Sequence, residues 1–145
     1  MRNAALCCAI CAAVLASAAG GTGPPSGTVL ARVLVSPLSV TVVVPADPPK
    51  VGRDFWIRAE VANAGSSAVQ NVAVTLLAPQ ALLLRDAATQ VLPQVRPAEI
   101  RSVRWDACAT TTGGYVVMAR ATAGPFTAES PGQLLQLTAA KRPSC

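Results

Sequence analysis

The sequence predicts an all-β protein, a Greek-key β-sandwich of seven to nine short strands without a convincing helix. Apolar and mostly polar residues alternate over several short runs; in residues 55–61 the odd-numbered positions are apolar, while Arg58 and Glu60 alternate with them. This period of two is typical of strands with one buried face. Clusters of Gly, Pro, Asn and Asp separate the runs roughly every 8–12 residues, the spacing of an antiparallel sandwich. No internal repeat indicates a solenoid or a propeller.

The first eighteen residues have the layout of a secretory signal peptide. A short basic start at 1–3 precedes an apolar run at 4–15, and Ala16-Ser17-Ala18 offers the small residues that signal peptidase cuts. The run is shorter than the about 20 residues of a transmembrane helix, so an uncleaved anchor is the lesser alternative. We therefore expect a secreted, periplasmic or cell-envelope protein that contacts a membrane only if this segment stays uncleaved.

Cleavage after residue 18 would remove three of the five cysteines and leave Cys108 and Cys145. Two thiols in an exported chain most simply form one disulfide, with free or intermolecular thiols as the alternative. The bond would close a loop of about 36 residues and stabilise the domain by roughly 3–4 kcal/mol.

The domain is expected over residues 28–145, after a Gly- and Pro-rich flexible linker at 19–27. Residues 28–35 and 38–44 form one bent edge strand or two short strands, because Pro37 cannot donate a ladder hydrogen bond. Residues 81–85 fit either a strand or a helical turn. Pro93 is expected to end one strand, and residues 130–132 to form a turn before the last. The remaining strands are expected at 55–61, 69–78, 89–92, 99–107, 115–123 and 133–138.

Several short motifs follow one another in an order that resembles a known family. They are Val51-Gly-Arg-Asp-Phe, Val61-Ala-Asn-Ala-Gly65, Leu92-Pro-Gln-Val-Arg-Pro97, Val103-Arg-Trp105 and Gly114-Tyr115. Together they resemble the bacterial CARDB-type domains, named for a suspected role in cell adhesion, and the related immunoglobulin-like domains appended to bacterial glycosidases. The resemblance covers roughly residues 38–138 and implies an immunoglobulin-like sandwich with an extracellular interaction role. The chain departs from the family at Ala98, where Gly is usual, and in carrying a single module.

The residue inventory argues against catalysis. The sequence has no histidine, so the commonest general base and metal ligand is absent. Its seven carboxylates are scattered, and neither the hydroxyls at 110–112 nor the thiol of Cys108 has an activating base nearby in sequence. We expect no enzyme activity and no cofactor. No metal site is assigned, and the sequence leaves open whether the scattered Asp residues bind a metal.

A binding patch is predicted at Trp56, Arg58 and Arg104. Strand alternation puts these side chains on an outer face, where neighbouring strands would form a basic stripe beside an aromatic ring; Arg120 also faces outward. Scattered solubilising arginines, and a tryptophan that covers a loop or sheet edge, are the simpler alternatives. Trp105 is assigned to the core. Tyr115 is assigned to a corner where its hydroxyl bonds the backbone, with stacking on a carbohydrate ligand as the alternative.

These observations predict an exported, non-catalytic immunoglobulin-like module that binds an extracellular protein or an envelope polysaccharide. The net charge of +5 suits an anionic surface but is too small to indicate a nucleic-acid partner. One alternative is a carbohydrate-contacting accessory module. Another is a structural subunit of an envelope assembly that pairs through the unpaired edge of its first strands.

Overall fold

A computed structural model describes residues 35–140 and residue 145, all within one compact unit, Val33–Cys145. The expected signal peptide at 1–18, the linker at 19–27 and most of the run at 28–35 lie outside the described residues. The boundaries predicted for these segments therefore stay predictions.

The described part consists of nine strands and has no helix, which confirms the predicted all-β class. Residues 81–85, ambiguous in sequence, contain a short strand. The strands are β1 (Leu38–Val43), β2 (Phe55–Asn63), β3 (Val69–Leu77), β4 (Leu82–Leu84), β5 (Thr89–Val95), β6 (Ile100–Ala109), β7 (Gly113–Ala123), β8 (Phe126–Glu129) and β9 (Gln133–Leu137).

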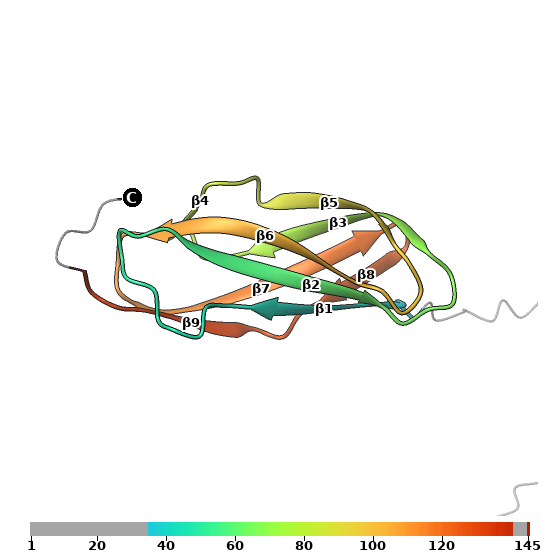
Figure 1. Ribbon diagram of the computed structural model, residues 1–145, viewed down its shortest axis with the longest axis horizontal. Coiled ribbons are helices and arrows are strands. Elements are labelled where there is room, and N and C mark those ends of the chain that lie inside the picture. Colours follow the sequence, from blue (N-terminus) through green and yellow to red (C-terminus); the bar gives the residue numbers. More distant parts are fainter. Residues whose placement is uncertain (1–34, 141–144) are drawn as a thin grey trace, which may run out of the picture. The chain divides into compact units, whose positions relative to one another are not determined.

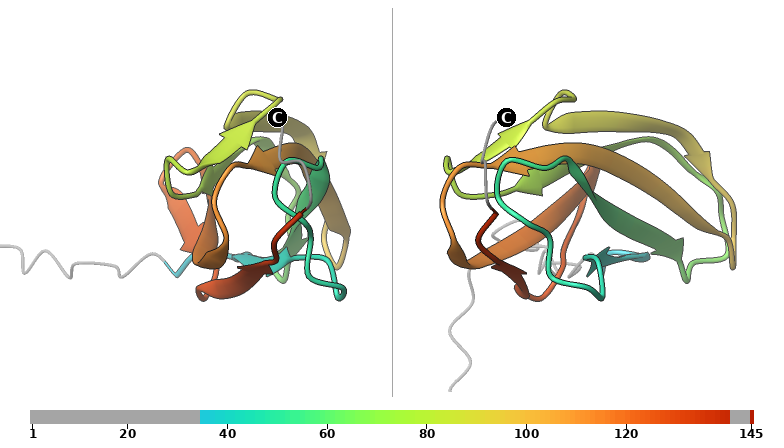
Figure 2. Two further views of the ribbon diagram at one scale, coloured as in Figure 1. Left: turned by 90° about the vertical axis from the view of Figure 1, so that its left-hand side faces the viewer. Right: turned by 60° about the vertical axis from the view of Figure 1, so that its left-hand side comes forward.

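The strands form two antiparallel sheets that face each other as a sandwich (Figures 1 and 2). The first sheet has the order β1-β2-β6-β4. The second has the order β5-β3-β7-β8, and β9 also pairs with β7. The chain changes sheets after each of the strands β2, β3, β4, β5 and β6, so most neighbours in a sheet are distant in sequence. This is the Greek-key sandwich that the alternation predicted.

The inner faces of both sheets supply the core. β2 alternates buried and half-buried residues along its whole length, as predicted. Trp105 on β6 is fully buried, and its indole Nε1 donates a hydrogen bond of 3.0 Å to the carbonyl oxygen of Ala87. The apolar ring is thus removed from water while its one polar atom keeps a hydrogen bond. The assignment of Trp105 to the core is confirmed.

The turn predicted at residues 130–132 is wrong, because β8 and β9 are two parts of one edge strand. Glu129 pairs with Arg120 of β7 and Gln133 pairs with Val117, so three residues oppose two in a β-bulge. Ser130 holds the bulge: its N–H donates to the carbonyl of Ala119, and its Oγ accepts from the N–H of Ala119, each at 2.8 Å. Proline in the bulge is tolerated because the strand is at the sheet edge.

The strand end predicted at Pro93 is also wrong, since β5 continues to Val95. Pro93 lies opposite Asn71 of β3, and the residues of β5 before and after it pair with β3 in one continuous register. Asn71 has a φ of 51°, in the left-handed region that asparagine tolerates. Because β5 is an edge strand, it tolerates a proline, which has no N–H to donate to a ladder.

The corner at Tyr115 has the hydrogen bond that the sequence predicted. The Tyr115 hydroxyl donates to the carbonyl oxygen of Thr111 at 3.1 Å and also contacts the Thr111 hydroxyl. The half-buried ring thus fixes the turn between β6 and β7, and its role is structural.

The disulfide between Cys108 and Cys145 is present, with Cα atoms 5.8 Å apart. Cys108 lies on β6 of the first sheet and is completely buried. Cys145 follows β9, which pairs in the second sheet. The predicted pairing of the two cysteines is confirmed, and the bond ties Cys145 to β6 of the first sheet.

Candidate functional site

The pairing of β2 with β6 brings the predicted binding residues together on the outer face of the first sheet. Arg58 lies directly opposite Arg104, and Trp56 lies opposite Asp106. Trp56 and Arg58 are half-buried, whereas Arg104 is exposed. We call Trp56, Arg58, Glu60, Arg104 and Asp106 the Trp56 patch.

Arg58 is held by the tryptophan and by a carboxylate. Its guanidinium carbon lies 5.9 Å from the centroid of the Trp56 ring, within the range of a cation–π contact. Its Nη2 forms an ion pair with Oε1 of Glu60 at 2.8 Å. The Arg58 Nε atom is buried and has no hydrogen-bond partner among the described residues. The guanidinium therefore covers part of the Trp56 ring instead of projecting freely into solvent.

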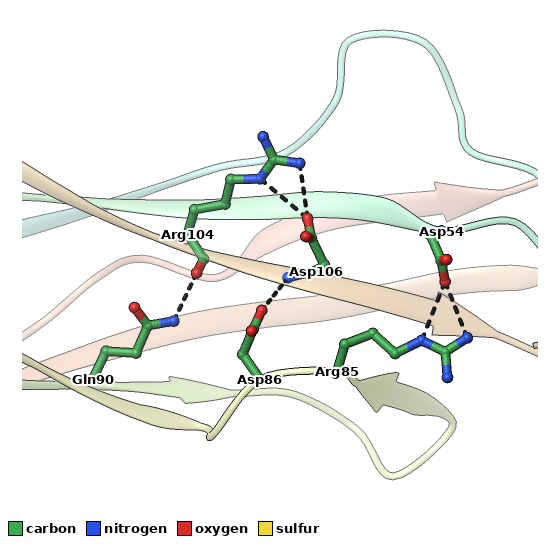
Figure 3. A network of polar contacts seen from close by, with 6 residues as sticks. All are labelled: Asp54, Arg85, Asp86, Gln90, Arg104 and Asp106. Carbon is green, nitrogen blue, oxygen red and sulfur yellow. Dashed lines mark hydrogen bonds and ion pairs between the residues drawn. The ribbon is translucent and has the colours of Figure 1, made fainter.

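Arg104 has its own carboxylate partner, shown in Figure 3. Its Nη2 and Nε donate to Oδ1 of Asp106 at 2.8 and 3.1 Å. Both side chains are at least half exposed, so this pair contributes little to stability. It fixes the direction of the Arg104 guanidinium on the surface.

Side chains also seal the part of the β6 edge that β4 does not reach (Figure 3). Asp86 accepts a hydrogen bond of 2.8 Å from the N–H of Asp106, and Gln90 donates one of 2.6 Å to the carbonyl of Arg104. The N–H of Arg85 donates to the carbonyl of Asp106 at 2.8 Å. These bonds replace the ladder that a longer β4 would supply.

A shallow hollow of about 280 Å³ adjoins the Trp56 ring. Arg85 and Asp54, which both line this hollow, form an ion pair of 3.2 Å (Figure 3). Trp56 also lines a second hollow of about 360 Å³, formed with the proline-rich turn before β2. Residues that line the first hollow are Asp54, Phe55, Trp56, Arg85, Arg104 and Asp106.

The patch is balanced in charge, which the sequence analysis missed. Each of its arginines pairs with a carboxylate, so the expected stripe is not net basic. The signal was present, because Glu60 follows Arg58 by two residues and Asp106 follows Arg104 by two, which puts each pair on one face of its strand. Arg120 is not part of the patch; it lies on β7 of the second sheet, paired with Glu129 at 2.6 Å.

The outer face of the second sheet is apolar where β7 meets β9. Val116 and Leu134 lie opposite each other and are 54% and 52% exposed. A larger hollow of about 550 Å³ lies between the start of β1, the β2–β3 turn and the β7–β8 turn, and none of the described residues that line it is charged.

The described residues contain no group of three or more potential metal ligands. The part of the chain with described structure also has no helix with the length and apolarity required to span a membrane.

No protein-family model and no curated protein matches the chain. Solved structures do match. A FixG-related protein from Vibrio parahaemolyticus is 15% identical, with a TM-score of 0.52 over 72% of this chain and 99% of that one. The CARDB domain of a Pyrococcus furiosus protein, crystallised in complex with di-metal ions, is 15% identical, with a TM-score of 0.51 over 70% of this chain and 87% of that one. A solution structure of that domain gives the same identity and score, over 70% and 94% of the two chains. These similarities establish that the chain has a CARDB-like, immunoglobulin-like fold, as the sequence motifs predicted.

Proposed function

We propose that this chain, a CARDB-like β-sandwich, is an exported, non-catalytic module that binds a protein partner through the Trp56 patch. The observation that carries the proposal is the register of β2 and β6. It gathers one tryptophan and two arginines beside a hollow on an otherwise regular sheet. Tryptophan and arginine are the residue types most enriched among those that dominate protein–protein binding energy.

Export is supported by the disulfide and by the signal-like first eighteen residues. Disulfides form and persist in oxidising compartments and are rare in the cytosol. The bond links the only two cysteines that remain after the expected cleavage. The expected localisation is the periplasm, the envelope or the medium.

A protein partner fits the charge pattern better than an anionic polymer. Alternating arginines and carboxylates form a mosaic that a folded protein can match group by group, which provides specificity. An anionic polysaccharide would gain from unpaired arginines, but here each patch arginine has a carboxylate within 2.8 Å. The stacked guanidinium also competes with a sugar ring for the face of Trp56.

The proposal is tested by co-sedimentation of the exported chain with envelope fractions, before and after protease treatment of those fractions. We expect the parent to pellet with untreated envelopes and to stay in solution with protease-treated ones. The double variant Arg58→Glu/Arg104→Glu should lose binding, because it confronts Glu60 and Asp106 with like charges and removes both patch cations.

The matched control is Arg120→Glu, which reverses one arginine of a similar exposed ion pair on the other sheet. It should bind as the parent does. Binding that survives protease treatment and falls with salt would instead support the alternative of an envelope polysaccharide. Equal loss of binding in Arg120→Glu and in the patch variant would refute a specific patch.

A further inference from the structure

Most edges of the two sheets carry a feature that blocks pairing with another strand. Free strand edges recruit other chains, and proteins protect them with short strands, prolines, charges or bulges. β4 has only three residues, and the rest of that edge is sealed by Asp86 and Gln90. β5 contains Pro93, and the β8–β9 edge is interrupted by its bulge and by Pro131.

β1 lacks every such feature. It is the edge strand of the first sheet, with the sequence Leu-Ser-Val-Thr-Val-Val, and has neither a charge nor a proline between Leu38 and Val43. Its residues alternate regularly between buried and exposed from the first to the fifth, so it has no bulge. Among the edge strands of the described chain it is the one without such a feature, and no ladder joins it to the nearby strand β8 of the second sheet.

The register identifies the backbone groups on the open side. The N–H and C=O of Asn63 bond to Glu99 and Ala98, on the β6 side of β2. Because backbone groups alternate along a strand, Glu60 bonds toward β1, and so its partner Thr41 bonds toward β2. The N–H and C=O groups of Val40 and Val42 consequently point away from the sheet.

We propose that β1 pairs antiparallel with β1 of a second copy, so that the chain forms a twofold-symmetric dimer. An axis through Thr41 places Val40 of one copy opposite Val42 of the other, and each such pair can exchange two N–H···O=C bonds. Val40 and Val42 lie one residue on either side of Thr41, which is the spacing that this reciprocal exchange needs. The first sheet then runs continuously through both copies.

The side chains around the axis suit a second copy of this chain. Thr41 is exposed and would face its symmetry mate, and Ser39 would face Val43. Threonine pairs are favourable cross-strand neighbours, and no like charges meet. The interface therefore matches itself, as a twofold contact requires. This dimer does not depend on the Trp56 patch, so either proposal can fail alone.

The test is the solution mass of the full exported chain, with its disulfide formed, by light scattering across a concentration series. We expect a dimer that dissociates on dilution. Thr41→Arg and Thr41→Glu, which place like charges on the axis, should each raise the dissociation constant by about a hundredfold or more. An equimolar mixture of the two variants should dimerise again, because opposite charges then meet.

Thr127→Arg is the matched control, since Thr127 is an exposed strand residue of the second sheet, and it should remain dimeric. Unfolding midpoints close to that of the parent show that the variants fold. A monomeric parent at every concentration overturns the proposal. Variants at Thr41 that dimerise as the parent does, or a mixture that stays monomeric, overturn it as well.

Discussion

Asn63 organises the turn between β2 and β3 through its side chain. The residue is 1% exposed, and its Nδ2 donates to the carbonyls of Ser67 and Val95 at 2.8 and 3.0 Å. Its Oδ1 accepts from the N–H of Gly65 at 2.9 Å. These three bonds give a physical reason for the Asn in the motif Val61-Ala-Asn-Ala-Gly65.

We predict that Asn63→Ala lowers the free energy of unfolding by about 2–4 kcal/mol, because it strands two carbonyls and one N–H near the core. Urea denaturation measures the change. Gln70→Ala, at an exposed residue of β3, is the control and should stay within about 0.5 kcal/mol of the parent. A similar small loss for Asn63→Ala would show that water replaces the three bonds.

Ala98 stands where the CARDB-type domains that the chain resembles usually have glycine, and its backbone has the conformation that favours glycine. Its φ is 58°, a left-handed conformation that is unfavourable for a residue with a Cβ. Its N–H bonds the carbonyl of Asn63 at 2.9 Å, so the conformation is fixed by the turn.

We predict that Ala98→Gly stabilises the protein by about 1 kcal/mol, since relief of the left-handed conformation exceeds the added entropy of the unfolded chain. Thermal and urea unfolding test this. Ala68→Gly, at an exposed residue without positive φ, should instead be neutral or destabilising. Destabilisation by both substitutions would contradict the argument.

At the scale of single residues, the sequence predicts the facing of Trp56, Arg58 and Arg104 because strand alternation alone determines it. It could not predict that Arg58 lies over the Trp56 ring, since that contact depends on rotamers. The acidic partners Glu60 and Asp106 were predictable, because each follows its arginine by two residues and therefore lies on the same face of the strand.

At the scale of elements, strands with one buried face were predicted closely, whereas the ends of the edge strands of the second sheet were not. Pro93 and residues 130–132 look like strand ends in sequence, yet both lie within edge strands of the second sheet. Proline interrupts a strand only where its missing N–H would bond a neighbour, and sequence alone does not identify the edges. The alternating pattern also does not predict which strands pair, so the part of β6 that β4 leaves unpaired became visible only in the structure.

The sealing of β6 leads to a prediction about local opening. Asp86→Ala removes the acceptor of the Asp106 N–H, so amide exchange at Asp106 should become faster while exchange in β2 stays unchanged. Hydrogen exchange followed by NMR measures both. Unchanged protection at Asp106 would mean that its N–H finds another acceptor.

At the scale of the whole molecule, the disulfide joins the end of the chain to β6 across a sequence separation of 37 residues. We predict that Cys145→Ser lowers the free energy of unfolding by roughly 3–4 kcal/mol, mainly by freeing the unfolded chain. Urea denaturation of the variant and of the reduced parent should give equal losses. A variant as stable as the oxidised parent would show that the loop contributes nothing.

The central claim is that the chain acts by binding a protein at the outer face of its first sheet. Site-specific photo-crosslinking in the exporting cell tests it most directly, with the crosslinker at Ser102, an exposed residue opposite Glu60, or at Thr127 on the other sheet. We predict a discrete protein adduct from Ser102 that disappears in Arg58→Glu/Arg104→Glu, and none from Thr127. Adducts from Thr127 alone, or none from either residue, would contradict the claim.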